Sequence, residues 1–448
     1  MFEKTFCLQK SKITKWSYFK SIFLSFVGVI GHNGYGSCLK CTTDGEYSYE
    51  FRTMIFPEIS APLRTDAEFR ARVYEGHHKN DSLLEQIHGI DMIRDFPIGD
   101  SLHLIDLGIT KRFLNGWKSG TLNNLDAKWS AAQIINVSNF LEQCKLPREF
   151  QRPARSLEHL ARWKGTEYRT FLLYLSPIIL RKFFDSEDIV DHFLNFFCAI
   201  QICSRHDQVA DNYKVARSLI TDFLEGVKAI YGTQLFCSNM HNLVHIIDDV
   251  ERFGPLDSFD AYPFESRLYT LKRLIRSGNL PLSQVSKRIT ELQTNMSKPG
   301  ISKDKRPTPV LKRKCITNGS DKILEDILKN KDSTAYSFID VHNFILDTTS
   351  DSDRWVLTST CEVLFVDKVI HNSVENSFFL YGSIVNDLTD FFVKPLASSS
   401  LFIYASNLRL KPPQIIKLGN IRGKMVKIDC QSTNLPKVVL LPLIHTLE

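Results

Sequence analysis

The chain contains 448 residues, which is enough for two or three domains, and its 43% hydrophobic and 24% charged residues are typical of a globular protein. A formal net charge of +6 allows a polyanionic partner without requiring one. The 10 cysteines are scattered apart from one close pair, which argues against a disulfide scaffold and indicates a reducing compartment.

Residues 1–30 form an N-terminal segment for which two interpretations stay open. Several lysines precede an apolar run over residues 21–30, as in the charged and apolar regions of a signal peptide. The run is shorter than the ~20 residues of a membrane-spanning helix, and no small-residue cleavage site is obvious. We therefore favour a core strand or helix over a signal peptide or anchor, and we expect no membrane partner.

Cys38 and Cys41 form the close cysteine pair, and glycines on both sides permit the tight turn that a zinc knuckle needs. Further along, His77 and His78 are adjacent in a short helical segment. Neighbouring residues on a helix do not share a face, so we expect these two histidines at the surface and not as a ligand pair.

Asp100 stands where a helix is predicted to begin and is a good N-cap residue, so that His103 and Asp106 fall on the first helical turns. The spacing allows two interpretations. Asp100 either caps the helix only, or forms with His103 a polar pair that lines an active-site cleft.

Residues 130–235 are predicted to be helical, because their apolar residues recur with a helical period. Four cations lie on or between these helices. They either contact phosphates or form a solvated helix face, and the candidates for DNA contact are Arg152, Arg155, Lys164 and Arg169.

His241 and His245 are four residues apart within an apolar stretch that Gly254 and Pro255 end, so they share one face of a buried helix. They are either hydrogen-bonded core histidines or metal ligands. Together with Cys38 and Cys41 they complete a tetrahedral Cys₂His₂ set, so we predict a structural Zn²⁺ site.

Glu265 follows on a new segment and precedes a basic helix face formed by Lys272, Arg273 and Arg276. The composition of residues 297–320 predicts a basic linker, which is also a candidate for nuclear import or nucleic-acid binding. Short β-branched and aromatic runs then predict a β-rich C-terminal domain over residues 321–448.

Several motifs in this order resemble the transposases of CACTA-type DNA transposons of animals. They are Cys-x-x-Cys, Asp-x-x-His-x-x-x-Leu-Gly, Pro-Arg-Glu-Phe-x-Arg, Trp-Lys-x-x-Glu-Tyr-Arg-x-Phe-Leu-Leu-Tyr, His-x-x-x-His and Phe-Gly-Pro-Leu, with Phe-Glu shortly after. The resemblance covers roughly residues 30–295, and it places residues 31–296 in one zinc-knuckle and helical domain. The recombinase that cuts antibody genes is similar in the arrangement of its zinc ligands and catalytic residues.

The resemblance implies an α+β fold with an RNase H-like core, a large helical insertion pinned by zinc, and a β-rich tail. It also implies three carboxylates that hold two divalent ions such as Mg²⁺ for strand cleavage and joining. Glu265 matches the third carboxylate, and Asp100 belongs to a family motif near the expected catalytic set. The two catalytic aspartates should precede the cysteine pair, yet no aspartate precedes Asp44 and the only earlier acid is Glu3.

We therefore expect a truncated or domesticated, transposase-derived nuclear protein that keeps DNA binding and has lost strand transfer, with Mg²⁺ relevant only if activity is retained. Homo-oligomers are compatible with this expectation. Two alternatives stay open: an active nuclease that receives carboxylates from a partner or a longer isoform, and a module for protein interaction.

Overall fold

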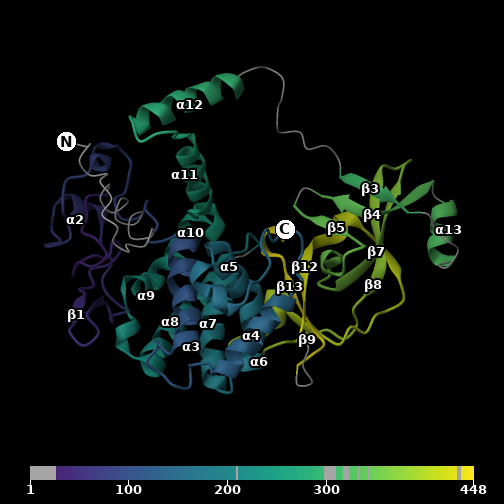
Figure 1. Cartoon of the computed structure of the whole chain (residues 1–448), viewed down its shortest axis with the longest axis horizontal. Helices are drawn as coiled ribbons and strands as arrows, with labels where there is room; N and C mark the ends of the chain where they lie inside the picture. Colours follow the sequence, from purple (N-terminus) through teal and green to yellow (C-terminus); the bar gives the residue numbers. More distant parts are fainter. Residues whose placement is uncertain are drawn as a thin grey trace.

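The computed structural model describes residues 27–207, 210–296, 309–315, 322–330, 332–341, 343–430 and 435–447. The predicted α+β class is confirmed, since a helical region with the Cys₂His₂ cluster precedes an antiparallel β-sheet domain. In Figure 1 the first described residues lie at one end, the helices occupy the middle and the sheet lies at the other end.

The N-terminal region is built from short elements around a small apolar core. Its elements are β1 (Glu46–Ser48), β2 (Thr53–Ile55) and α2 (Asp66–Arg70). Val27 and Val29 are buried in this core beside Phe69. Residues 1–26 lie outside the described residues. The structure therefore tests the core element predicted over residues 21–30 only at residues 27–30, where Val27 and Val29 are buried.

The predicted surface position of His77 is wrong, because this side chain is fully buried. The backbone amide of Ile30 donates to the carbonyl oxygen of His77, and the ring Nδ1 lies 2.6 Å from the carbonyl oxygen of Gly36. Its ring also meets Phe69 edge to face. His77 lies in a turn and not in a helix, so the prediction from neighbouring positions on a helix did not apply to it.

The helical body confirms the helical periodicity predicted for residues 130–235. Two π-helical segments, η3 (Ser101–Thr110) and η5 (Phe171–Leu175), continue directly into α-helices. The α-helices are α3 (Lys111–Ser119), α4 (Ala131–Gln143), α5 (Gly165–Thr170), α6 (Ser176–Phe183), α7 (Glu187–Cys203), α8 (Ala210–Tyr231), α9 (Ser238–Asn242) and α10 (Ile246–Phe253).

Aromatic side chains fill the centre of this body. The rings of Phe113 and Trp117 on α3 pack against Phe193 on α7, with centroid distances of 5.6 and 4.9 Å. These edge-to-face contacts add to the burial of large apolar surfaces. The aromatic stripes are therefore core, and they fix α3, α7 and α8 as the frame on which the metal ligands and Asp100 are placed.

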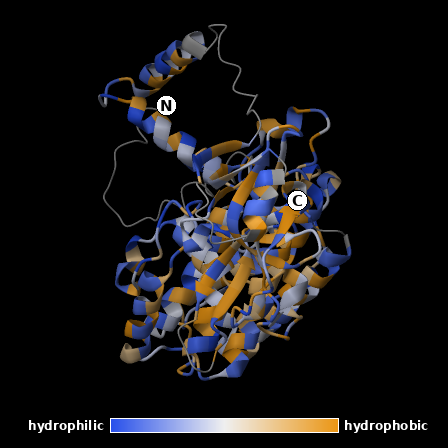
Figure 2. Cartoon of the chain, turned by 90° about the vertical axis from the view of Figure 1, so that its right-hand side faces the viewer, coloured by the Kyte–Doolittle hydropathy of each residue, from blue (hydrophilic) through white to orange (hydrophobic). Residues whose placement is uncertain are grey.

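The C-terminal domain is one antiparallel sheet whose main path runs in the order β11-β8-β7-β6-β12-β13-β10-β9, with β4 pairing with β7, β3 and β5. Figure 2 shows its strands as predominantly hydrophobic. The strands are β3 (Val310–Lys314), β4 (Ser333–Asp340), β5 (Ile345–Asp347), β6 (Trp355–Thr358), β7 (Val363–Asn372), β8 (Ser377–Ile384), β9 (Thr389–Asp390), β10 (Tyr404–Ser406), β11 (Gln414–Lys417), β12 (Ile421–Asp429) and β13 (Val438–Pro442), and one helix, α13 (Lys322–Asn330), precedes β4.

The sheet and the helical body share one apolar core, because Val426, Val439 and Leu441 belong to the same buried cluster as the helices. A buried lysine sits in the contact. Lys424 is 0% exposed, and its Nζ donates to Glu149 Oε2 at 2.8 Å and to Asp353 Oδ1 at 2.7 Å. The sheet is thus held to the body by apolar packing and by a paired charge.

Two helices, α11 (Tyr262–Leu274) and α12 (Pro281–Met296), project from the body in Figure 1. We call them the arm. The predicted linker of residues 297–320 follows, and its described part differs from the prediction because residues 310–314 form β3, paired with β4. Within the described residues, no helix has the length and apolar character required to cross a bilayer.

Candidate metal centre

The two cysteines and two histidines meet in space although about 200 residues separate them in the chain. Cys38 Sγ lies 3.5 Å from His245 Nε2, and Cys41 Sγ lies 3.3 Å from His241 Nε2. The two sulfur atoms are 3.5 Å apart. All four ligand atoms lie within 4.8 Å of one another, and all four residues are buried.

These separations fit a tetrahedral ion. Zinc bonds of about 2.3 Å to sulfur and about 2.0 Å to nitrogen place two sulfurs about 3.8 Å apart and a sulfur and a nitrogen about 3.5 Å apart. The observed distances are close to both values. The donor set is also the one that structural zinc sites use, so the cluster can hold a metal ion such as zinc.

Contacts outside the four ligands orient them. The Nδ1 of His241 lies 3.0 Å from the carbonyl oxygen of Glu58, which directs Nε2 toward the sulfurs. Arg64 is buried and donates through Nε to the carbonyl oxygen of Cys38 at 3.0 Å. Lys40, between the cysteines, forms a 2.8 Å ion pair with Asp249 on α10.

The cluster also sets the protonation of its thiols. Burial opposes ionisation of Cys38, but hydrogen bonds with Cys41, His241 and His245 outweigh it and hold the pKa of Cys38 well below its usual value. The hydrogen bond to Cys38, together with burial, raises the pKa of Cys41. A bound divalent cation would supply the positive charge that stabilises both sulfurs as thiolates.

A second polar cluster joins the start of η3 to the start of α11. Asp100 Oδ1 accepts a hydrogen bond from the backbone amide of His103 at 2.9 Å, so the predicted capping role is present. The other oxygen lies 2.9 Å from His103 Nδ1, and His103 Nε2 lies 3.8 Å from Glu265 Oε1. Asp100 therefore caps the helix and also positions a histidine that faces Glu265.

Asp106 is buried next to this cluster, and its position in the sequence did not predict a specific role for it. Tyr262 donates its hydroxyl to Asp106 Oδ2 at 2.8 Å. Burial raises the pKa of the Asp106 carboxyl to about 8, despite the nearby Arg169 guanidinium and the Tyr262 hydrogen bond. The one feature of the sequence that could have pointed to Asp106 was its position three residues after His103, which places both side chains on neighbouring helical turns.

The glycine at position 165 belongs to the same junction. A Cβ atom there would lie 2.2 Å from Leu102 Cδ1 and 2.8 Å from the hydroxyl oxygen of Tyr262. Only glycine allows α5 to approach η3 and α11 this closely. The residue thus fixes the distance between the helical body and the base of the arm.

The predicted DNA-contacting cations differ in their surroundings. Arg155 Nη2 donates to Glu167 Oε2 at 2.8 Å, and Arg169 Nη1 lies 3.8 Å from Asp260 Oδ2. Arg152 and Lys164 are exposed on the body. Exposed cations of the arm include Lys272, Arg273 and Arg276.

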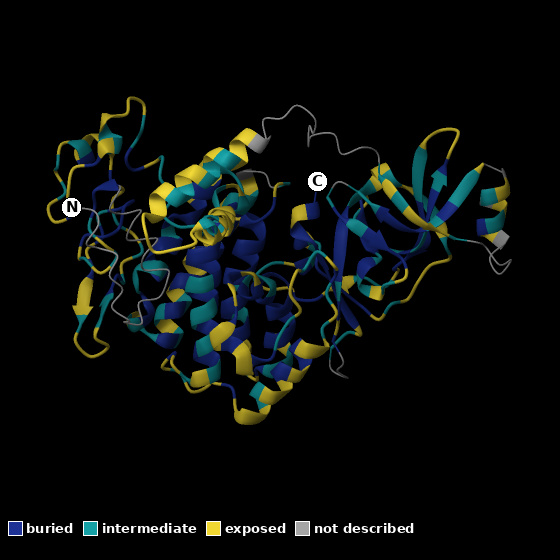
Figure 3. Ribbon diagram, turned by 45° about the horizontal axis from the view of Figure 1, so that its top comes forward, coloured by how far each residue is buried: buried dark blue, intermediate teal, exposed yellow. Residues whose placement is uncertain are grey.

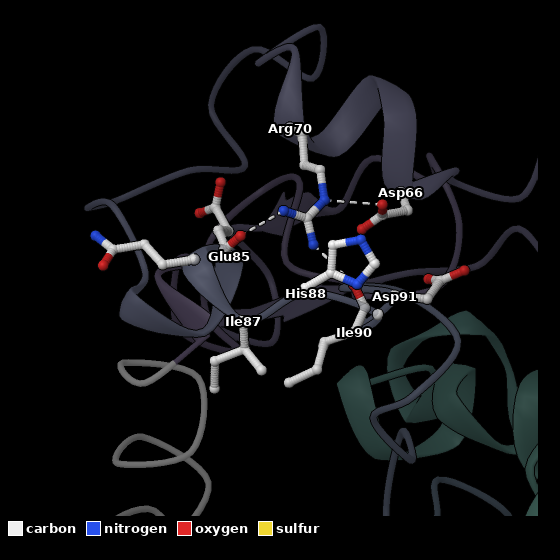
Figure 4. A pocket seen from close by; sticks show the side chains of 9 residues that line it. Asp66, Arg70, Glu85, Ile87, His88, Ile90 and Asp91 are labelled. Carbon is white, nitrogen blue, oxygen red and sulfur yellow. Dashed lines mark hydrogen bonds and ion pairs between the residues drawn. The ribbon is translucent and has the colours of Figure 1, made fainter.

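A polar cavity of about 500 Å³ lies in the N-terminal region (Figure 4). Arg70 crosses it and donates to Asp66 and to the carbonyl oxygens of Glu85 and Ile90. Asp91 accepts from the backbone amides of Ile93 and Arg94. The charged groups of this cavity are therefore used to hold its own loops.

Residues 318–443, which contain β4 to β13, match a family described as a domain of unknown function, DUF8592. A search of curated proteins found no match to the chain.

Proposed function

We propose that this chain is a transposase-derived, DNA-binding protein of the nucleus that has lost strand-transfer activity. In this proposal the protein is a remnant of an RNase H-like transposase whose helical insertion is pinned by a structural zinc ion. The observation that carries the proposal is the meeting of Cys38 and Cys41 with His241 and His245, in the order that the resemblance to CACTA-type transposases implies.

The arm supports the DNA-binding part of the proposal. Residues 262–296 contain six Lys and Arg residues and two Glu residues, a net charge of +4, whereas the whole chain carries +6. Within the described residues no ion pair engages Lys272, Arg273 or Arg276. Exposed, unpaired cations on one projecting element are suited to phosphate contact.

The surroundings of Glu265 support the loss of strand transfer. Two-metal cleavage needs several carboxylates that converge on two ions. Here Asp100 is engaged with His103, Asp260 lies beside Arg169, and burial keeps Asp106 protonated at neutral pH. Among the described residues, the Cys₂His₂ set is the only group of three or more histidine, cysteine, aspartate or glutamate side chains that can hold a metal ion.

The test is duplex DNA binding by the purified chain, measured by fluorescence anisotropy over a series of salt concentrations. We expect log Kd to rise linearly with log salt, because cation–phosphate contacts release counterions. Neutralising two arm cations with Arg273→Gln and Arg276→Gln should reduce the slope by roughly 2 and weaken binding.

The matched control neutralises two exposed lysines outside the arm, Lys79→Gln and Lys417→Gln, and should leave the slope nearly unchanged. Absence of DNA binding at low salt, or binding that does not depend on salt, would overturn the proposal and favour a module for protein interaction. An active nuclease that receives carboxylates from a partner or a longer isoform is the second candidate. It is favoured by the position of Glu265 near His103 and Asp100.

A further inference from the structure

The arm carries an apolar repeat that its basic charge does not explain. On α11 the repeat is Phe264, Leu268 and Leu271, with steps of four and three residues, and Ile275 follows at the C-cap. On α12 the steps are three, four and three, and the residues are Leu282, Val285, Ile289 and Leu292. Apolar residues with alternating three- and four-residue steps form the seam of a coiled coil.

This seam is not used within the described part of the chain. Phe264 is 64% exposed, Leu268 is 49% exposed and Leu282 is 84% exposed. No residue of α11 is buried, and the described apolar clusters include no residue of 263–294. Figure 3 shows both helices as largely exposed. A contiguous exposed apolar face of this kind marks an interaction surface.

The charges beside the seam indicate what covers it. With Leu268 at the first core position of the heptad and Leu271 at the second, Glu265 and Lys272 both occupy the position that follows the second core residue, and Arg267 occupies the position that precedes the first. In an antiparallel pair of identical helices, Glu265 of one copy lies next to Lys272 of the other. A parallel pair would instead bring Arg267 next to Lys272, which is repulsive.

We propose that α11 is a homodimerisation helix that pairs antiparallel with α11 of a second copy of this chain. The two-fold axis repeats the Glu265–Lys272 contact at two positions along one side of the seam, so a single self-complementary surface satisfies both chains. The antiparallel direction also aligns the helix dipoles favourably. It places the two helical bodies at opposite ends of the helix pair, since α11 rises from the body at Tyr262 (Figure 1).

The test is sedimentation velocity of the purified full chain in the absence of DNA. The chain is expected to be a dimer, and Leu268→Glu is expected to make it a monomer because the charge replaces a seam residue. Leu268 is exposed in the single chain, so circular dichroism should show an unchanged fold. The matched control is Leu125→Glu, at an 87% exposed leucine outside the arm, which should remain dimeric.

Charge reversal tests the direction of the pair. Lys272→Glu should weaken the dimer by roughly tenfold, because two symmetric attractions become repulsions. The double variant Glu265→Lys with Lys272→Glu should restore the affinity of the unmodified chain. A monomeric unmodified chain, or a dimer that survives Leu268→Glu, overturns the proposal, and a dimer that Lys272→Glu strengthens overturns its antiparallel form.

Discussion

Cys38 Sγ lies 3.5 Å from His245 Nε2, although 207 residues separate the two in the chain. This contact joins the N-terminal region to the end of the helical body. A metal ion at this point links segments that are distant in the chain. The unfolded chain has no such preformed site, so the free energy of metal binding adds to the stability of the folded chain. The site therefore has a structural role that can be measured apart from any activity.

Replacing one ligand should remove the metal and destabilise the fold. We expect the purified chain to contain one zinc ion, as measured by mass spectrometry, and His245→Ala to lose it. The free energy of unfolding should then fall by roughly 4 kcal/mol, because loss of a structural metal is among the largest single-residue effects. Chelation of the unmodified chain should have a similar effect.

Cys315→Ser provides the control for this experiment, since Cys315 is a free, half-buried cysteine away from the cluster. It should keep both the zinc content and the stability. A purified, folded chain without zinc, whose stability is unaffected by His245→Ala, would contradict the assignment.

The four metal ligands could be predicted from the sequence because their residue types and spacings indicate metal binding directly. Cys38, Cys41, His241 and His245 are residue types with few other reasons to occur at these spacings, and a tetrahedral ion needs all four. Asp106 could not be assigned in the same way. Its raised pKa depends on burial by segments that are far apart in sequence, and its partner Tyr262 is 156 residues away.

The fold likewise contains features that local sequence predicts and features that depend on long-range contacts. The strands around Trp355 and Val438 follow from local β-branched and aromatic composition, and the structure contains them as β6 and β13. Strand order and the pairing of β3 with β4 depend on long-range contacts, so composition alone predicted a linker at residues 310–314. His77 was misplaced for a related reason, since its burial depends on a backbone contact with Ile30.

The buried lysine between the sheet and the body should be important for stability. Lys424→Met would leave Glu149 and Asp353 without this cation, and removing one partner of a buried ion pair costs roughly 3–5 kcal/mol. Urea denaturation should show this loss. Lys417→Met, at an exposed lysine of β11, is the control, since no ion pair among the described residues engages Lys417 and the expected cost is about 0.5 kcal/mol or less. Equal costs for the two variants would contradict the assigned role of Lys424.

Asp106 should make stability depend on pH. Burial raises its pKa to about 8 in the folded chain, well above the ~3.9 of an unfolded aspartate. The folded chain therefore holds a proton that the unfolded chain releases between these values. The stabilising contribution is complete below about pH 4 and is lost as the pH rises to about 8.

Asp106→Asn removes this titration while keeping the shape of the side chain. The stability of the variant relative to the unmodified chain should increase with pH between 5 and 8, by up to roughly 1.4 kcal/mol per pH unit. Urea denaturation at several pH values measures the difference, in which the other titrating groups largely cancel. A difference that is constant over this range would show that Asp106 is already ionised in the folded chain.

We expect the purified chain with Mg²⁺ or Mn²⁺ neither to nick nor to join DNA that carries the terminal repeats of the related element. Cleavage by two metals requires ions about 3.5–4 Å apart, held by carboxylates from several segments. Glu265 is exposed enough to bind an ion, but Asp100 is committed to His103 and Asp106 is protonated at neutral pH. A gel assay of labelled DNA measures the outcome, and a chimera that adds the two aspartate-bearing strands of a related transposase is the positive control. Cleavage by the unmodified chain that requires a divalent ion and disappears with Glu265→Gln would favour the active nuclease instead.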